Sequence, residues 1–272
     1  MTIFLSDVLE LENPGAYKLH LACKNKDGIE PLDEFVADPK EWLGWNEYRG
    51  RKNDWTRPYV LAFMRFYPRA EAWLFGGGFE VMDRREDGYT LRPLPVLEKY
   101  VGRLIILFHR TRGMRGRAFN LERHLEQCLV SQVLAQVYDG ENFPGFEHLC
   151  HDFNTLEALF RNERPDWMAS LKNVKGVYVI ADKSNGKLYL GSATGDAGLW
   201  ASLAWYLLGH GHGGNTELEN VLQQHGPVYA RVNFRFSLLE VFTSTTPDTQ
   251  VLTREAHWKR ALLTREFGYN RQ

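Results

Sequence analysis

The sequence predicts a mixed α/β (α+β) chain of two domains: a β-rich domain over residues 1–165, and a three-stranded antiparallel sheet with flanking helices over 166–272. Three observations support this prediction. Short apolar runs separated by turn residues fill 59–109, which is typical of small sheets. An Asn-Gly dipeptide at 185–186 lies between two alternating segments, as in a hairpin. Later segments repeat their apolar residues at a helical period.

Composition describes a soluble globular protein, with 44% hydrophobic and 25% charged residues among 272. No apolar run approaches the ~20 residues of a membrane span, and the first residues lack the basic and apolar regions of a signal peptide. The three cysteines, Cys23, Cys128 and Cys150, are odd in number and widely spaced. We therefore expect a cytoplasmic protein without a disulfide framework or a cysteine zinc site. The net charge of −1 leaves any polyanion binding to local patches.

In the N-terminal part, Asp38 before Pro39 predicts the start of a short helix. The predicted strands are Tyr59–Phe66, Ala72–Phe75, Gly78–Met82 and Arg103–His109, with a turn at Gly76-Gly77. A helix is expected over Leu121–Val137, because apolar residues recur there near a 3.6 period after Asn120, a plausible cap.

Two stretches of this part mix residues that nucleic acids attract. Residues 42–57 interleave aromatic and cationic side chains, so Trp45 and Trp55 are candidates for stacking on bases. The other reading is that these aromatics anchor loops onto the core. The loop 109–117 is basic and rich in glycine, and it is either a phosphate clamp or a solvated connection. Its candidate phosphate ligands are Arg110, Arg112, Arg115 and Arg117.

The C-terminal part begins with the hairpin. Whether Tyr178 and Tyr189 share one face of it depends on the strand register. A helix over about 199–208 would bring Ser202 and Tyr206 together, since they are four residues apart. A third strand is expected over 235–242. Thr246, Pro247 and Asp248 then predict the start of a helix that runs to about residue 263.

Glu255 lies inside the apolar stripe of that last helix, with Val251, Trp258 and Leu262. A carboxylate in this setting has to be paired, hydrogen-bonded or bound to a cation, because burying it alone costs several kcal/mol. Arg254 and Lys259 are nearby in sequence but are expected to point to the side. Periodicity alone leaves a structural ion pair and a divalent metal equally open.

These features occur in a combination that resembles the GIY-YIG nucleases, a family named after two tripeptides. Here they read Gly-Val-Tyr at 176–178 and Tyr-Leu-Gly at 189–191, followed by a helix, a third strand, a helix with an inward Glu255, and Asn270. The resemblance covers 166–272 and includes restriction endonucleases of the same type. No family is indicated by the N-terminal part.

The resemblance implies hydrolysis of DNA phosphodiesters with one Mg²⁺ or Mn²⁺ held by Glu255. Tyr178 or Tyr189 would deprotonate or position the attacking water, and Tyr206 would contact the scissile phosphate or share that task. Asn270 would hold the face of the site together. A phenol with a free pKa of ~10 is a poor base, so a nearby cation such as Lys187 would be needed to ionise it.

The sequence departs from the family at one position. The family places an arginine on the helix after the second tripeptide, one turn before a Tyr or His, and that position is Ser202 here. Loss of such a charge typically costs about a hundredfold to a thousandfold in rate, so the chain is expected to be inactive or weak. Three explanations are open: a deliberate inactivating substitution, a natural relative that only binds, or a replacement by Arg231, Arg235 or Arg254.

We therefore expect a metal-dependent endonuclease that acts on double-stranded DNA, as in the restriction of foreign or modified DNA, with recognition by the N-terminal domain. Cutting both strands with one metal per site would favour a homodimer on DNA. The alternative is a nucleic-acid-binding protein without catalysis on the same scaffold. His212 is a candidate phosphate ligand. A different enzyme that uses His212 or His210 is a further alternative, although a solvated loop is the commoner outcome.

Overall fold

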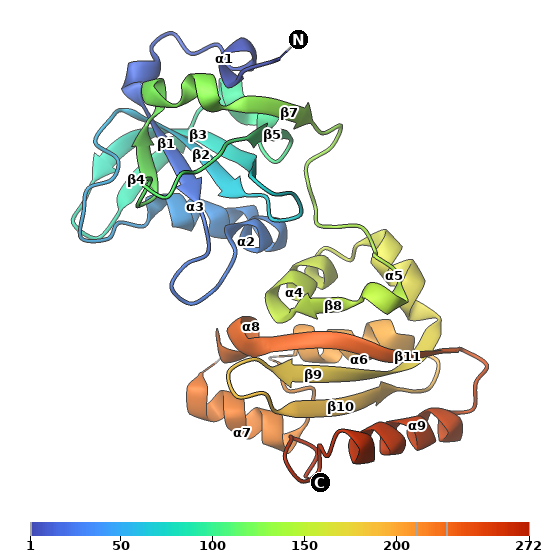
Figure 1. The fold of residues 1–272 in the computed structure, drawn as a ribbon. Helices are drawn as coiled ribbons and strands as arrows, with labels where there is room; N and C mark the ends of the chain where they lie inside the picture. The colour runs from blue at the N-terminus through green and yellow to red at the C-terminus, as the bar shows by residue number, and fades with distance from the viewer. Residues whose placement is uncertain (1, 210, 227, 272) are drawn as a thin grey trace. The chain divides into compact units, whose positions relative to one another are not determined.

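A computed structural model describes residues 2–209, 211–226 and 228–271 of the chain. They form two compact units, Met1–Tyr138 and Asp139–Gln272 (Figure 1). The mixed α+β class predicted from the sequence is confirmed. Among the described residues, no helix has the length and apolarity that crossing a bilayer requires.

The N-terminal unit is built on one mixed sheet. Its strands are β1 (Tyr17–Ala22), β2 (Tyr59–Arg65), β3 (Ala72–Arg84), β4 (Tyr89–Pro93), β5 (Leu104–Leu107), β6 (Ala118–Asn120) and β7 (Leu129–Val133). They are ordered β6-β1-β2-β3-β5-β7, with β4 also on β3. Only β1 and β2 run parallel among these described pairings. The α-helices are α1 (Leu5–Val8), α2 (Pro31–Ala37) and α3 (Pro39–Glu47). Asp38 accepts a hydrogen bond from the Lys40 N–H, as expected of a cap.

The prediction of a helix over Leu121–Val137 is wrong. Short 3₁₀ turns at Leu121–Arg123 and Leu125–Gln127 lead into β7, which pairs with β5. Asn120 does not cap a helix; its side chain accepts a hydrogen bond from Lys18 at 2.9 Å. A short apolar run fits a strand as well as a helix, and the open edge of β5 decided the outcome through its unpaired backbone groups.

The turn predicted at Gly76-Gly77 is also wrong, because β3 continues through it with a register shift opposite Ala62/Phe63. The glycines serve close packing. A Cβ atom on Gly76 would lie 2.5 Å from Trp42, whose indole N–H donates to the Gly76 carbonyl at 2.8 Å. Glycine inside a strand commonly marks such a bulge or close approach.

The C-terminal unit has an antiparallel sheet in the order β10-β9-β11-β8. Its strands are β8 (Cys150–Asp152), β9 (Val174–Asp182), β10 (Leu188–Ala193) and β11 (Phe234–Thr243). Its helices are α4 (Phe153–Arg161), α5 (Pro165–Lys172), α6 (Gly198–Leu207), α7 (Thr216–His225), α8 (Val228–Asn233) and α9 (Asp248–Ala261). The three strands and the two long helices that we predicted are present, and β8 extends the sheet beyond them.

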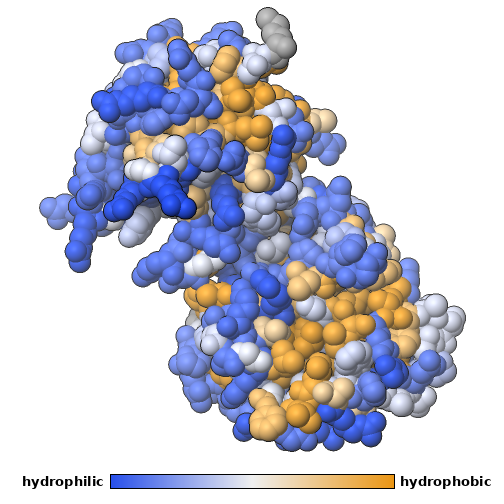
Figure 2. Space-filling view, viewed as in Figure 1, coloured by the Kyte–Doolittle hydropathy of each residue, from blue (hydrophilic) through white to orange (hydrophobic). Residues whose placement is uncertain are grey.

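Successive residues of β9 face opposite sides of this sheet. Tyr178 and Ile180 pack with α6 in the larger core, whereas Val177 and Val179 pack with Val251 of α9. Figure 2 shows hydrophobic residues gathered on the face of this unit that displays β9 and β11 in Figure 1. One face of the sheet thus packs against α6 and the other against α9, and β10 is an edge strand of the sheet.

The domain boundary predicted at 165/166 differs from the structural division at 138/139. The intervening segment belongs to the C-terminal unit, because β8 pairs with β11 and α4 buries Leu156 and Phe160 in the same core as Leu203. Arg164 before Pro165 breaks a helix, but only between α4 and α5. A local helix break therefore does not mark the place where contacts across the chain become few.

The hairpin between β9 and β10 is present but its turn is longer than predicted. β9 ends at Asp182 and β10 begins at Leu188, so the loop spans 183–187, and of the Asn-Gly dipeptide only Gly186 has a positive φ, +76°. Asp182 holds this loop together by accepting hydrogen bonds from Ser184, Tyr229 and Tyr269. The hairpin therefore has a longer loop, stabilised by hydrogen bonds to the buried Asp182, in place of a tight two-residue turn.

Candidate active site

Three phenols from three elements meet on the α6 side of the sheet. Tyr178 of β9 lies opposite Gly191, and Tyr189 of β10 lies opposite Ile180, so the register places both phenols on one face. Tyr206 of α6 completes the group, with its ring centroid 5.9 Å from that of Tyr178 and 5.8 Å from that of Tyr189. The Tyr206 hydroxyl donates to the Tyr189 hydroxyl at 2.8 Å.

Two glycines make room for these rings. A Cβ atom on Gly191 would lie 2.6 Å from the Tyr178 hydroxyl, and one on Gly213 would lie 2.4 Å from the Tyr206 ring. Gly213 also has a φ of +52°, which other residues rarely adopt. The glycine of the second tripeptide is thus required by the tyrosine of the first.

Burial keeps these phenols protonated. It is the largest cause of the raised pKa of Tyr178, Tyr189 and Tyr206, and the charges of their neighbours add to it. The Glu255 carboxylate contributes to the rise at all three, since a nearby negative charge disfavours a phenolate. All three hydroxyls are therefore donors as well as acceptors at neutral pH.

Glu255 of α9 is held by two neighbours. Ser192 donates to one carboxylate oxygen at 2.6 Å, and the Lys259 ammonium lies 2.5 Å from the other. The side chains of Glu255 and Lys259 are only 12% and 20% exposed. Our expectation that Lys259 points to the side is wrong, because residues four apart on a helix face the same way. Arg254 instead pairs with Glu240.

Ser202 of α6 lies beside Tyr178 and Tyr206 and lines an open hollow of about 340 Å³. Tyr178, Tyr206, Trp205 and Gly213 line it too. The side chain of Ser202 therefore occupies a wall of the hollow where the family would place an arginine. Without a charge there, the wall offers a phosphate only neutral hydrogen-bonding groups.

No arginine proposed as a replacement is directed at the hollow. Arg231 lies 2.8 Å from Glu157, Arg235 lies 2.8 Å from Asp152, and Arg254 pairs with Glu240. Each is neutralised by a carboxylate outside the tyrosine group. Of the three explanations for Ser202, replacement by one of these arginines is the one that the structure contradicts.

Asn270 secures the edge strand of the site. Its amide donates to the Leu190 carbonyl at 2.8 Å and its oxygen accepts from the Leu190 N–H at 2.7 Å. The side chain is buried and acts on β10 as a neighbouring strand would. Leu190 lies between Tyr189 and Gly191, so these two bonds fix the segment that carries both.

Two other predicted site residues lie apart from the tyrosines. Lys187 is exposed, and its ammonium lies over the ring of Tyr269 at 5.5 Å, not beside Tyr178 or Tyr189. His212 accepts a hydrogen bond from the Gly214 N–H at 3.1 Å, within the glycine-rich loop whose Gly213 lines the hollow. His210 lies outside the described residues.

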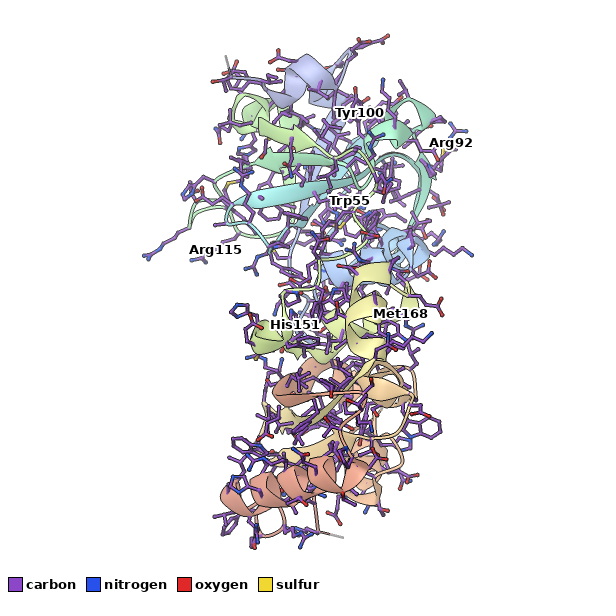
Figure 3. All side chains as sticks on the ribbon, turned by 90° about the vertical axis from the view of Figure 1, so that its right-hand side faces the viewer. Trp55, Arg92, Tyr100, Arg115, His151 and Met168 are labelled. Atoms are coloured by element: carbon purple, nitrogen blue, oxygen red, sulfur yellow. The ribbon has the colours of Figure 1, made fainter. Side chains whose placement is uncertain are left out.

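In the N-terminal unit, Trp55 is wrong as a stacking residue. The side chain, labelled in Figure 3, is fully buried. Its indole N–H donates to the Asn46 carbonyl at 2.7 Å, and its ring packs against His20 and Tyr89. Trp55 has a structural role and not a base-stacking one, because burying a large aromatic side chain contributes more free energy than leaving it exposed. Trp45 is half-buried and remains a candidate.

The basic loop divides into bound and exposed arginines. Arg117 lies 2.8 Å from Asp54 and 4.9 Å from the Trp55 ring, and Arg110 donates to backbone carbonyls of its own loop. Arg112 and Arg115 are exposed, and Arg115 projects away from the ribbon in Figure 3. A phosphate in solution can therefore reach Arg112 and Arg115, whereas Arg117 is occupied within the fold.

Sequence reasoning missed Ser192 as a neighbour of Glu255, and no local pattern marks it. It precedes Ala193 at the end of β10 and reaches α9 only through the strand register. Among the residues that the structure describes, no three His, Cys, Asp or Glu side chains gather into a metal cluster. The donor set near the tyrosines is a single carboxylate. That set fits a hard cation that keeps most of its waters, as Mg²⁺ does, and no closed cage.

Comparisons with known proteins add little to this geometry. No family model matches the chain, and no curated protein matches it. Among solved structures, a mutant of the catalytic domain of intron endonuclease I-TevI is similar over 36% of this chain and 94% of its own length. The identity is 26% and the TM-score 0.28. At so low a score, this similarity decides neither fold nor activity.

Proposed function

We propose that the C-terminal unit is a GIY-YIG-type DNA endonuclease domain, and that it is inactive or weak as it stands because Ser202 occupies the place of the helix arginine. The observation that carries the proposal is the tyrosine group: Tyr178 and Tyr206 line the open hollow, Tyr189 bonds to Tyr206, and the Glu255 charge acts on all three phenols. These side chains come from β9, β10, α6 and α9, so no single motif brings them together.

An open hollow suits a polymeric substrate. A small metabolite is usually enclosed by its pocket, whereas a DNA strand has to pass across the site with its ends outside. The lining of Tyr178, Ser202 and Tyr206 presents hydroxyl groups to solvent over the buried rings. Hydroxyls commonly contact phosphate oxygens in protein–DNA complexes.

The phenols are suited to positioning a water and donating hydrogen bonds. In hydrolysis, water attacks the phosphorus, the bond to the leaving oxygen breaks, and that oxygen takes up a proton. Because the pKa of each phenol is raised, Tyr178 and Tyr189 would orient the water and Tyr206 would donate to a phosphate oxygen. Asn270 would keep β10 in register during this step.

We propose Glu255 as the ligand of one Mg²⁺ or Mn²⁺. A bound cation would neutralise the charge that develops on the phosphate oxygens. Lys259 pairs with one oxygen of the Glu255 carboxylate, so its ammonium would have to move away for a metal ion to bind that oxygen.

The N-terminal unit would recognise the DNA, and restriction of modified or foreign DNA would follow from that role. Trp45 remains available for stacking, and Arg112 and Arg115 for phosphate contacts. A homodimer on DNA would supply the second site that cutting both strands requires.

A second candidate function is DNA binding without cleavage. The Glu255–Lys259 pair favours it, since the carboxylate already has a cation and needs no metal. The absence of charge at Ser202 favours it as well. Titration of the full chain with Mn²⁺ separates the two functions: binding that Glu255→Gln removes supports the endonuclease, and no Mn²⁺ binding supports the binding protein.

Restoring the arginine tests the endonuclease. Ser202→Arg should produce Mn²⁺-dependent cleavage of plasmid DNA, modified or unmodified, at least a hundredfold above the unaltered protein. Leu208→Arg is the matched control: it adds the same charge to the exposed end of α6, away from the residues that line the hollow. Adding Glu255→Gln to Ser202→Arg should abolish cleavage. Equal activity of the two arginine variants, or none on either DNA, contradicts the proposal.

A further inference from the structure

A pocket of about 280 Å³ lies at one end of the N-terminal sheet. Its lining includes Cys23, Arg65, Arg69, Glu71, Trp73 and Arg110. The strand pairing explains why they meet. Parallel β1 and β2 end together, with Ala22 opposite Met64, and antiparallel β3 and β5 begin and end at that same edge, with Ala72 opposite Leu107. Residues just beyond four strand ends therefore surround one space.

Positive charge dominates this space. Three arginines and one carboxylate line it. Arg65 is balanced by the buried Glu30 at 3.3 Å, and Glu71 pairs with His109. Within the described residues, Arg69 and Arg110 have no carboxylate within ion-pair distance; Arg69 donates to the Ser131 hydroxyl and Arg110 to the Cys23 sulfur. Two guanidinium charges are thus left for something outside the chain.

Arg110 is held in place before any ligand arrives. Its guanidinium donates to the carbonyls of Met114, at 3.2 Å, and Gly116, and to the sulfur of Cys23 at 3.2 Å. It also lies 5.7 Å from the ring of Phe119. A guanidinium has five N–H donors, so some remain to bind a ligand. Fixing the side chain in advance lowers the entropy that binding costs.

The chemistry selects an anion. Guanidinium groups repel metal ions, and two of them match the oxygens of a phosphate through paired hydrogen bonds. Burial raises the pKa of the Cys23 thiol, so the thiol is neutral and does not oppose a negative ligand. Exposed Arg112 and Arg115 follow Arg110 in the same loop and extend the positive charge outward.

We propose that this pocket binds a phosphate group through Arg69 and Arg110. The source is either free phosphate or the phosphate of a nucleic acid. Only the second source rests on the proposed function, where it would give the N-terminal unit a fixed point on the DNA. The pocket itself does not depend on cleavage by the C-terminal unit.

Calorimetric titration of the full chain with inorganic phosphate, in EDTA, tests the proposal. Arg69→Gln should weaken phosphate binding about tenfold or more, because a charge-assisted hydrogen bond is lost. Arg110→Lys keeps the charge without the fork and should weaken it less. Arg123→Gln is the matched control, since Arg123 is exposed and lies beyond the opposite end of β1, next to the Lys18–Asn120 pairing. Unfolding midpoints should agree among the variants.

Competition identifies the source. If only a 5′-phosphorylated oligonucleotide displaces phosphate, the pocket takes a strand end; if the 5′-hydroxyl form does so too, it takes the backbone; if neither does, it takes free phosphate. All three outcomes support the pocket. No phosphate binding by the unaltered chain, or equal affinity in Arg69→Gln and Arg123→Gln, overturns it. Absence of cleavage by the Ser202→Arg variant would leave these results unaffected, so the two proposals fail separately.

Discussion

Each unit contains a cluster of aromatic and polar side chains, and the two clusters differ in what their polar groups do. Around Trp55 in the N-terminal unit, the indole N–H and the Arg117 guanidinium are bonded to protein atoms, and the ring is fully buried. Around Tyr206 in the C-terminal unit, hydroxyls bond to one another at the wall of a hollow.

The difference shows how to separate a structural cluster from a candidate site. Both contain residue types that bind nucleic acid, so composition does not distinguish them. The Trp55 cluster has used its hydrogen-bonding groups within the fold, as buried groups must. Tyr178 and Tyr206 of the tyrosine cluster instead line an open hollow, where a ligand can reach them. The three predictions below test this comparison.

Replacing Trp55 and Trp205, one from each cluster, should give the largest difference in the free energy of unfolding. Trp55→Ala should lower the free energy of unfolding by about 3–5 kcal/mol, the usual cost of removing a buried indole. Trp205→Ala should change it by less than about 0.5 kcal/mol, because that side chain is 66% exposed on the wall of the hollow. Denaturant unfolding measures both. Similar losses would mean that the two clusters do not differ in structural role.

Replacing two glycines should have effects of opposite sign. Gly191→Ala should destabilise the protein by about 1–3 kcal/mol, since its methyl group would lie 2.6 Å from the Tyr178 hydroxyl. Gly44→Ala should stabilise it by about 0.5–1 kcal/mol, because no atom lies within 4 Å of the added methyl group in α3. Thermal unfolding of the two variants provides the measurement. A neutral Gly191→Ala would show that the tyrosine group is loosely packed.

The free energy of unfolding should fall steadily as the pH rises into the alkaline range, because of the tyrosine cluster. The pKa values of Tyr178, Tyr189 and Tyr206 are raised in the folded state, so above pH ~10 the unfolded chain loses protons first. Stability therefore falls as pH rises, by up to about 1.4 kcal/mol per pH unit for each phenol. Tyr206→Phe should make this slope shallower.

Denaturant unfolding between pH 9 and 11 (about one unit on each side of the free phenol pKa) measures the slope. Ser202→Ala is the control, because it removes a hydroxyl from the same hollow without removing a titrating group. A slope that Tyr206→Phe leaves unchanged would show that Tyr206 ionises as it does in the unfolded chain.

Local signals predicted the C-terminal elements well. Pro247 and Asp248 marked the start of α9, although its N-cap residue is Pro247 and not the predicted Thr246, and the apolar period placed α6 within one residue of its observed bounds, Gly198–Leu207. The same reasoning failed over Leu121–Val137, where a strand edge competed for the chain. It also failed for Lys259, whose i+4 spacing from Glu255 was sufficient to predict the pair.

The sequence by itself predicted the hairpin and the inward position of Glu255, because these depend on periodicity and on residues close in the chain. It predicted two domains too, but placed their boundary at 165/166 instead of 138/139. Only the tertiary structure decided which side chains meet. The shared face of Tyr178 and Tyr189 depends on register, the Ser192–Glu255 bond joins β10 to α9, and the pocket of Arg69 and Arg110 lies at the ends of four strands. Contacts between distant segments follow from packing of the whole unit, and no local pattern encodes them.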